Sequence, residues 1–217
     1  MDESPRHPCL EPFSAPVRRW FARAFDRPTP AQERGWPVIA GGHSALIAAP
    51  TGSGKTLAAF LWCLDELSRR LDRAGREGVP DGVPGVHTLY VSPLKALNYD
   101  VERNLRAPLR GIRAAARELG QTPPTIRVAV RTGDTSRSRR AAMIRTPPHV
   151  LITTPESLFI LLTSPRALPM LARVRYVVVD EIHALCGNKR GASLALSLER
   201  LTALGARQRE PDRKSVV

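Results

Sequence analysis

The chain has 217 residues, which allows one α/β domain and is too short for two full domains of that class. Its formal net charge of +13 and sequence pI near 11.0 favour a polyanionic partner. No run approaches about 18 apolar residues, and the first residues lack the positive flank and apolar core of a secretory leader, so we expect a cytoplasmic protein without a membrane partner. The three cysteines have no metal-ligand spacing, which predicts reduced thiols.

Strands alternate with helices along most of the chain. In chain order, we expect a mobile Pro-rich start over residues 1–12, helices over 15–25 and from Thr29-Pro30, a buried strand over 44–49 and a helix over 57–71. A Gly/Pro-rich loop over 75–85, a strand over 87–91 and a helix over 94–119, broken at Pro108, should follow. The remaining elements are strands over 125–131 and 149–153, a short helix over 156–162, a strand over 175–179 and an amphipathic helix over 192–204. This order predicts an α/β fold, a mostly parallel sheet with helices on both faces and functional residues at the carboxyl ends of its strands.

The first chemical motif is the string Ala49-Pro50-Thr51-Gly52-Ser53-Gly54-Lys55-Thr56. It fits the phosphate-loop pattern, in which glycines let successive N–H groups point at a phosphate and the loop opens a helix. We therefore expect residues 51–54 to hold a nucleoside triphosphate, Lys55 to reach its β- and γ-phosphates, and the Thr56 hydroxyl to bind Mg²⁺. An isolated motif of this length is also compatible with a plain flexible turn.

The second motif, Asp180-Glu181-Ile182-His183, follows the apolar run Arg175-Tyr176-Val177-Val178-Val179. An acid at the carboxyl end of a buried strand is in the place where an open α/β sheet exposes functional groups. We expect Asp180 to hold the magnesium, usually through water, and Glu181 to orient or deprotonate the attacking water. Alternatively, two adjacent acids can simply cap the following helix. Together with the phosphate loop, they predict a catalytic site for ATP and Mg²⁺.

The positive charge is concentrated in one stretch. Between residues 103 and 148, eleven arginines stand against Glu118 and Asp134, which accounts for +9 of the net +13. Nucleic acid is the polyanion that we expect to meet this stretch. The alternative is that these arginines belong to ordinary solvated helix faces, because the chain uses arginine almost to the exclusion of lysine.

Further short strings resemble a known family. Residues 24–32 look like the adenine-recognising Q motif of superfamily 2 helicases, with Ala24 and Ala31 in place of the usual Gly and Ile. The strings Ser92-Pro93-Leu94-Lys95-Ala96-Leu97, Arg131-Thr132-Gly133-Asp134-Thr135 and Thr153-Thr154-Pro155-Glu156-Ser157-Leu158 are similar to motifs Ia, Ib and Ic. Taken together, these motif sequences most closely resemble those of the large helicase-related (Lhr) family, over roughly residues 13 to 200. The resemblance implies a RecA-like fold of the P-loop NTPase class.

The resemblance also implies roles for single residues. Gln32 would bind the adenine edge through its amide, with a surface glutamine as the alternative. The loops after three strands would contact nucleic-acid phosphates without reading bases, through Lys95, Arg131 and Thr154, while Pro93, Gly133 and Pro155 shape those loops. His183 would link the ATP site to a motif between two lobes, with a packed histidine as the alternative.

The end of the chain departs from the family. We divide the chain into an N-terminal segment (1–12), a helicase ATP-binding lobe (13–205) and a tail (206–217). Members of the family continue into a second RecA-like lobe at this point, whereas this sequence ends. The last six residues of the tail match the translation of the start of a common sequencing adapter. We therefore expect an artefactual tail and a missing second lobe in cis.

In the parent protein we expect an ATP-dependent helicase acting on single-stranded or tailed DNA. The alternative substrates are RNA and an RNA:DNA hybrid. The alternative functions are an RNA helicase of the Ski2-like or DEAD-box type and a non-motor, single-lobe nucleic-acid-binding protein.

Overall fold

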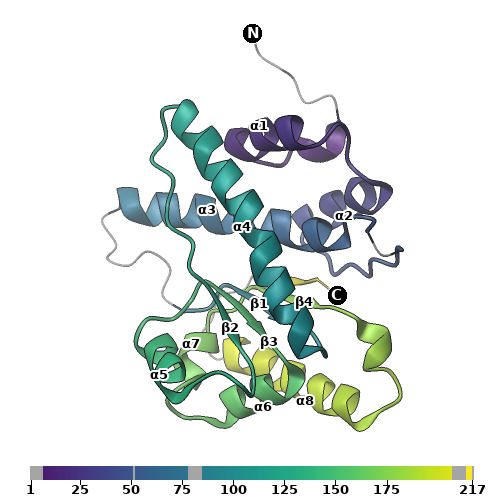
Figure 1. Cartoon of the computed structure of the whole chain (residues 1–217), viewed down its shortest axis with the longest axis vertical. Helices are drawn as coiled ribbons and strands as arrows, with labels where there is room; N and C mark the ends of the chain where they lie inside the picture. Colours follow the sequence, from purple (N-terminus) through teal and green to yellow (C-terminus); the bar gives the residue numbers. More distant parts are fainter. Residues whose placement is uncertain (1–6, 51, 78–84, 207–213, 217) are drawn as a thin grey trace. The chain divides into compact units, whose positions relative to one another are not determined.

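The computed structural model describes residues 7–50, 52–77, 85–206 and 214–216, and for residues 95–97 and 214–216 it describes the backbone alone. The chain divides into two compact units, the first made mainly of residues 1–82 and 104–125, the second of residues 83–103 and 126–215 (Figure 1). The helix α4 (Lys95–Glu118) begins in the second unit and continues in the first. Each unit carries half of the predicted chemistry, because the phosphate loop lies in the first and Asp180 lies in the second.

The first unit is helical. It contains the 3-10 helix η1 (Pro8–Leu10) and the helices α1 (Ala15–Ala24), α2 (Pro30–Ala40) and α3 (Lys55–Arg76). Aromatic rings from distant parts of the sequence fill its core, where the ring centroid of Phe13 lies 5.1 Å from that of Trp36 and 5.6 Å from that of Trp62, both edge to face. The start of α1 is tied to α3, since the buried carboxylate of Asp65 accepts the Ser14 N–H at 3.0 Å.

The second unit is built on a parallel sheet. Its strands are β1 (Thr88–Val91), β2 (Val128–Arg131), β3 (Val150–Thr153) and β4 (Tyr176–Val179), in the order β2-β3-β1-β4, with β5 (Lys214–Val216) beside β4. The register pairs Val91 with both Thr153 and Val179, so the carboxyl ends of β1, β3 and β4 lie level. β1 and β3 are buried along their whole length, which explains their unbroken apolar sequences.

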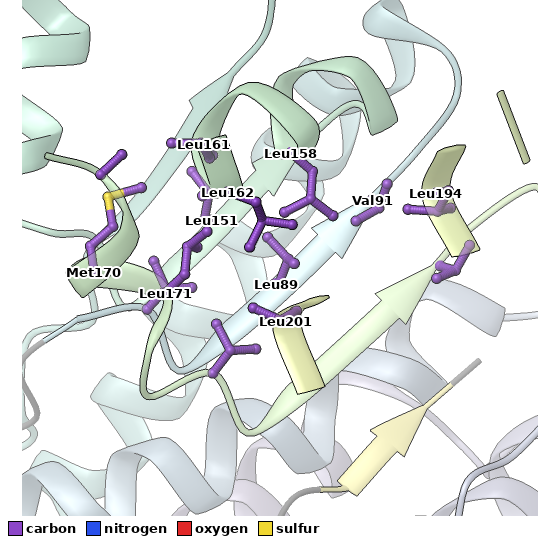
Figure 2. Close-up of a cluster of buried hydrophobic side chains, with 14 of the residues drawn as sticks. Leu89, Val91, Leu151, Leu158, Leu161, Leu162, Met170, Leu171, Leu194 and Leu201 are labelled. Carbon is purple, nitrogen blue, oxygen red and sulfur yellow. The ribbon is translucent and has the colours of Figure 1, made fainter. Parts of the chain in front are cut away.

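Helices cover one side of this sheet. The helices α6 (Pro155–Thr163), α7 (Leu168–Leu171) and α8 (Lys189–Ala206) lie together along it (Figure 1). Figure 2 shows how leucines of α6 and α8 point at Leu89 and Leu151 of the strands, forming one apolar cluster. The second unit also contains α5 (Arg137–Arg145) and the 3-10 turn η2 (Ile182–Ala184), which complete its connections.

Most predicted elements are confirmed within a few residues, including the helix from Thr29-Pro30. Thr29 and Gln32 form a capping box there, and Pro30 occupies the first turn. Neither α5 nor α7 was predicted from the sequence. Among the described residues no helix is both long and apolar enough to cross a membrane.

The predicted strand over residues 44–49 is wrong. These residues form no strand, and Leu46 is 73% exposed. An apolar run shows only that a segment suits a buried strand, and a strand also needs a neighbour to complete its backbone hydrogen bonds. Within the described residues, β4 has β1 on one side and β5 on the other.

Two further expectations differ from the structure. The predicted break at Pro108 is absent, because α4 continues through it with Leu105 and Ile112 buried on either side. Proline removes one helical hydrogen bond, and packing of the flanking residues keeps the helix together. The mobile start predicted for residues 1–12 includes η1, where Cys9 and Leu10 are buried; residues 1–6 and 207–213 lie outside the described residues.

Candidate ATP-binding and nucleic-acid-binding residues

The phosphate loop opens α3 in the first unit. Gly52 and Gly54 have φ angles of +80° and +79°, in the left-handed region that L side chains rarely adopt. Gly54 is the N-cap of α3, a helix of 22 residues whose first N–H groups and dipole favour an anion. Thr51 lies outside the described residues. The two left-handed glycines and the helix start fit the predicted phosphate-binding loop, whose binding of phosphate stays a prediction.

Lys55 begins α3 and folds back over the loop. Its ammonium donates to the carbonyl oxygen of Ala49 and, at 2.8 Å, to that of Pro50. An ammonium has three N–H donors, so this arrangement leaves a third for an anion. Ser53 and Thr56 are half-buried next to it. A lysine held at the mouth of such a loop fits the recognition of phosphate oxygens.

Gln32 contacts this same loop. Its Oε1 accepts the Thr29 N–H at 3.1 Å, and its Nε2 donates to the Gly54 carbonyl oxygen at 3.4 Å. The side chain is buried, which excludes the surface-glutamine alternative. A Cβ on Gly54 would lie 2.6 Å from Gln32 Nε2, so the glycine allows this close approach. The adenine contact of Gln32 stays a prediction.

The acidic motif follows β4 in the second unit. The Tyr90 hydroxyl of β1 donates to Asp180 Oδ2, and the Glu181 N–H donates to Asp180 Oδ1 at 3.0 Å. Burial first, and then the bond to Asp180, raises the pKa of Tyr90, so its hydroxyl remains a donor. Glu181 has a φ of +51°, and such backbone strain in a residue other than glycine is concentrated at functional sites.

His183 and Glu181 lie side by side. His183 Nδ1 is 3.3 Å from Glu181 Oε2, and the His183 side chain is 79% exposed. This exposure excludes the packed-histidine alternative. In the described part of the chain, no three His, Cys, Asp or Glu side chains gather into a metal site. One carboxylate is compatible with Mg²⁺, because this ion is commonly held by one or two carboxylates together with substrate phosphates and water.

The three loops predicted to meet nucleic acid are joined at the carboxyl edge of the sheet. The Ser92 N–H donates to the Thr153 carbonyl oxygen at 3.0 Å, and Thr153 Oγ1 donates to the Arg131 carbonyl oxygen at 2.7 Å. Hydrogen bonds between these strand ends bring together segments that are distant in sequence.

The predicted phosphate ligands differ in exposure. Pro93, Thr154 and Pro155 are buried, and the Thr154 hydroxyl caps α6 by accepting the Ser157 N–H at 3.4 Å. Gly133 is exposed. Lys95 begins α4, and its side chain lies outside the described part.

Arg131 is buried, and its desolvation, followed by the charge of Arg140, lowers its pKa. Arg140 Nη2 donates to the Gly133 carbonyl oxygen at 2.6 Å and so braces the loop. From the sequence, Arg140 was counted only in the basic stretch, and no role was predicted for Tyr90. Neither side chain belongs to a sequence motif that identifies its partner.

Known helicases resemble this chain in sequence and in fold. A family model described as DEAD/DEAH box helicase matches residues 29–217. The chain is 55% identical over 192 residues to the Lhr helicase/probable uracil glycosylase of Mycolicibacterium smegmatis, and the match covers 88% of this chain and 12% of that protein. It is 51% identical over 194 residues to the ATP-dependent helicase Lhr-Core protein 2 of Thermococcus barophilus, covering 89% of this chain and 22% of that protein.

A solved structure, Mycobacterium smegmatis helicase Lhr bound to ssDNA and AMP-PNP, superimposes with a TM-score of 0.85 at 52% identity and covers 96% of this chain and 25% of that chain. This likeness confirms the α/β, RecA-like fold. The chain spans between 12% and 22% of the length of the curated relatives named above. Because the family model covers all but the first 28 residues, this chain belongs to the DEAD/DEAH box helicase family.

Proposed function

We propose that this chain is the ATP-binding lobe of an ATP-dependent DNA helicase of the Lhr type. In the longer protein, ATP hydrolysis would drive movement along one strand and unwinding of a duplex. The observation that carries the proposal is the loop of left-handed glycines at Gly52 and Gly54, which opens α3 at Lys55. The strained Glu181 after Asp180 at the end of β4 supports the same chemistry.

ATP would be held chiefly by the first unit. The backbone of the loop and the Lys55 ammonium would bind its phosphates, and Gln32 would meet the adenine. The Thr56 hydroxyl and the Asp180 carboxylate would hold Mg²⁺, which when bound neutralises charge on the β- and γ-phosphate oxygens. Glu181 would orient the attacking water and accept its proton.

The partner of the second unit would be single-stranded or tailed DNA. An Lhr relative has been solved with ssDNA, and the present chain carries +13. Lys95, Arg131 and the loops around Gly133 and Thr154 would contact phosphates, which makes binding salt-dependent and nearly independent of sequence. A second RecA-like lobe in cis would supply the arginines that complete hydrolysis, so we expect the lobe alone to hydrolyse ATP slowly.

The nucleotide arm of the test uses the 217-residue chain, a fluorescent ATP analogue and Mg²⁺. We expect binding that weakens about tenfold or more in Lys55→Ala and on removal of Mg²⁺ with EDTA. Lys189→Ala is the matched control, since it removes the same charge outside the loop. Equal affinity in Lys55→Ala and the parent chain would overturn the assignment of the loop.

The nucleic-acid arm measures the anisotropy of labelled dT20 and rU20 at several salt concentrations. We expect binding of dT20 that falls steeply with salt. Affinity for rU20 more than tenfold tighter than for dT20 would contradict a DNA helicase and point to RNA, because 2′-hydroxyl contacts separate the two. Helicase-like unwinding by this chain alone would contradict the need for a second lobe.

A further inference from the structure

The first turn of α8 is fixed to the segment that follows the acidic motif. Asn188 Oδ1 accepts the N–H groups of Arg190 and Gly191 at 3.0 and 3.1 Å, so this side chain caps the helix. Its Nδ2 donates to the Ala184 carbonyl oxygen at 2.9 Å. A single amide therefore connects the start of α8 to η2, which directly follows Glu181.

Gly191 brings the two segments into backbone contact. A Cβ on this residue would lie 1.9 Å from the Leu185 carbonyl oxygen and 2.9 Å from its carbonyl carbon. Those atoms belong to backbone, which cannot turn aside as a flexible side chain does. Only glycine fits this place, so the start of α8 has little freedom relative to the end of η2.

From this fixed base, the Arg190 side chain reaches two other loops. Its Nε donates to Glu156 Oε1 at 2.6 Å, and its Nη2 donates to the Pro93 carbonyl oxygen at 2.8 Å. Pro93 follows β1, and Glu156 lies in the first turn of α6 after β3. Burial acts to raise the pKa of Glu156, but hydrogen bonds, with the one from Arg190 first among them, hold this pKa below its usual value. The planar guanidinium can address both acceptors at once, whereas an ammonium acts as a point charge.

The energy of this contact is small. The Arg190 and Glu156 side chains are 43% and 55% exposed, and an ion pair this accessible to water contributes little to stability. Both acceptors, however, belong to loops predicted to bind phosphates. A contact of low stabilising value that spans two such loops suits a positioning role.

We propose that Arg190 is a positioning residue that sets the spacing between the Ser92–Leu94 loop and the Thr154–Ser157 turn, and that Asn188 ties both to η2, the turn after Glu181. The inference rests on the proposed binding of nucleic acid by those loops. Successive phosphates of a strand are regularly spaced, so two loops bind them together only when their own separation is held. Losing Arg190 frees that separation and weakens binding without removing a phosphate contact.

The experiment compares dT20 affinities of the 217-residue chain by anisotropy across a salt series. We expect about three- to tenfold weaker binding in Arg190→Ala and Arg190→Lys, with an unchanged slope of log affinity against log salt. Were Arg190 a phosphate ligand, the slope would fall by about 1. The matched control is Arg200→Ala, which removes an equal charge from α8, where Arg200 donates to the Leu162 carbonyl oxygen at 3.2 Å.

The direction of the change in dT20 affinity in Glu156→Ala separates two possible roles of Glu156. Removing a negative charge beside a polyanion strengthens binding if Glu156 acts only through its charge, but weakens it if Glu156 anchors Arg190. We expect weaker binding, and no further loss in the double variant with Arg190→Ala. Circular dichroism and thermal melts check folding, and Arg190→Lys retains charge and stem if the alanine variant fails to fold.

Normal dT20 affinity in both Arg190 variants, or tighter binding in Glu156→Ala, overturns the positioning role while leaving the proposed function intact. A parent chain that does not bind dT20 overturns both.

Discussion

Removing the Tyr90 hydroxyl tests how the acidic motif is held. Tyr90 is buried on β1, opposite Val178 of β4, and its hydroxyl reaches diagonally to Asp180 Oδ2. Tyr90→Phe keeps the ring and removes the hydroxyl that makes this bond. The Glu181 N–H still holds the other carboxylate oxygen.

The expected loss in unfolding free energy follows from burial and charge. Hydrogen bonds to charged groups contribute about 1.5 to 3 kcal/mol. Asp180 is half-buried, so water replaces part of what the hydroxyl gave. We therefore expect a loss of about 1 to 2 kcal/mol at pH 7. Above pH 10 the loss should shrink, since the raised pKa of Tyr90 means that only the unfolded chain releases this proton as pH rises.

The assay is urea denaturation followed by circular dichroism on Tyr90→Phe, Asp180→Asn and the double variant. The cycle should give a coupling energy of about 1 kcal/mol or more. Tyr99→Phe is the control, because Tyr99 is 47% exposed and its loss should change stability by less than about 0.5 kcal/mol. A Tyr90–Asp180 coupling below about 0.3 kcal/mol would refute this reasoning.

Three other perturbations test the core and the loop. Burial and then the charge of Arg127 lower the pKa of His149 to about 4, so protonation of this side chain opposes folding. The unfolding free energy should therefore fall by about 3 kcal/mol between pH 6.5 and pH 4. Urea titrations of His149→Asn should lack this dependence of stability on pH. Asp65→Ala leaves the Ser14 N–H without its acceptor and should lower the unfolding free energy by about 2 kcal/mol, against about 1 in Asp65→Asn, again by urea denaturation. Gly54→Ala forces a side chain to φ +79° and should cost about 1 to 2 kcal/mol, measured by thermal melts; an unchanged melting temperature would contradict the strain.

An element of the fold could be predicted when the residues that determine it lie close together in the sequence. The start of α2 was predictable, because Thr29, Pro30 and Gln32 form a complete capping signal within four positions. Strands β1 to β4 were predictable from their apolar runs. The run over residues 44–49 is also apolar and forms no strand, because apolar composition does not determine which strand a segment pairs with.

The candidate site also contains residues that could be predicted from the sequence and residues that could not. The loop glycines and the Asp180-Glu181 pair were readable because their chemistry is written in consecutive residues. Tyr90 and Arg190 were not, because each acts on a group more than thirty positions away and its partner is set by sheet register or helix placement. Arg190 lies outside the arginine-rich stretch over residues 103–148, and no role was assigned to it from the sequence.

The arrangement of the second unit explains why such distant partners can matter. β3 and β4 flank β1, and the carboxyl ends of these three strands lie level. A displacement of the segment after β4 therefore acts on the same sheet edge that carries the loops after β1 and β3. The backbone bond from the Ser92 N–H to the Thr153 carbonyl oxygen fixes the roots of those loops, and Arg190 links their outer parts. Backbone bonds at the roots survive a change in side chains, whereas the outer link depends on one guanidinium. The start of α8 is therefore one link between the acidic segment and the outer parts of these loops, and changing it tests nucleic-acid affinity separately from folding.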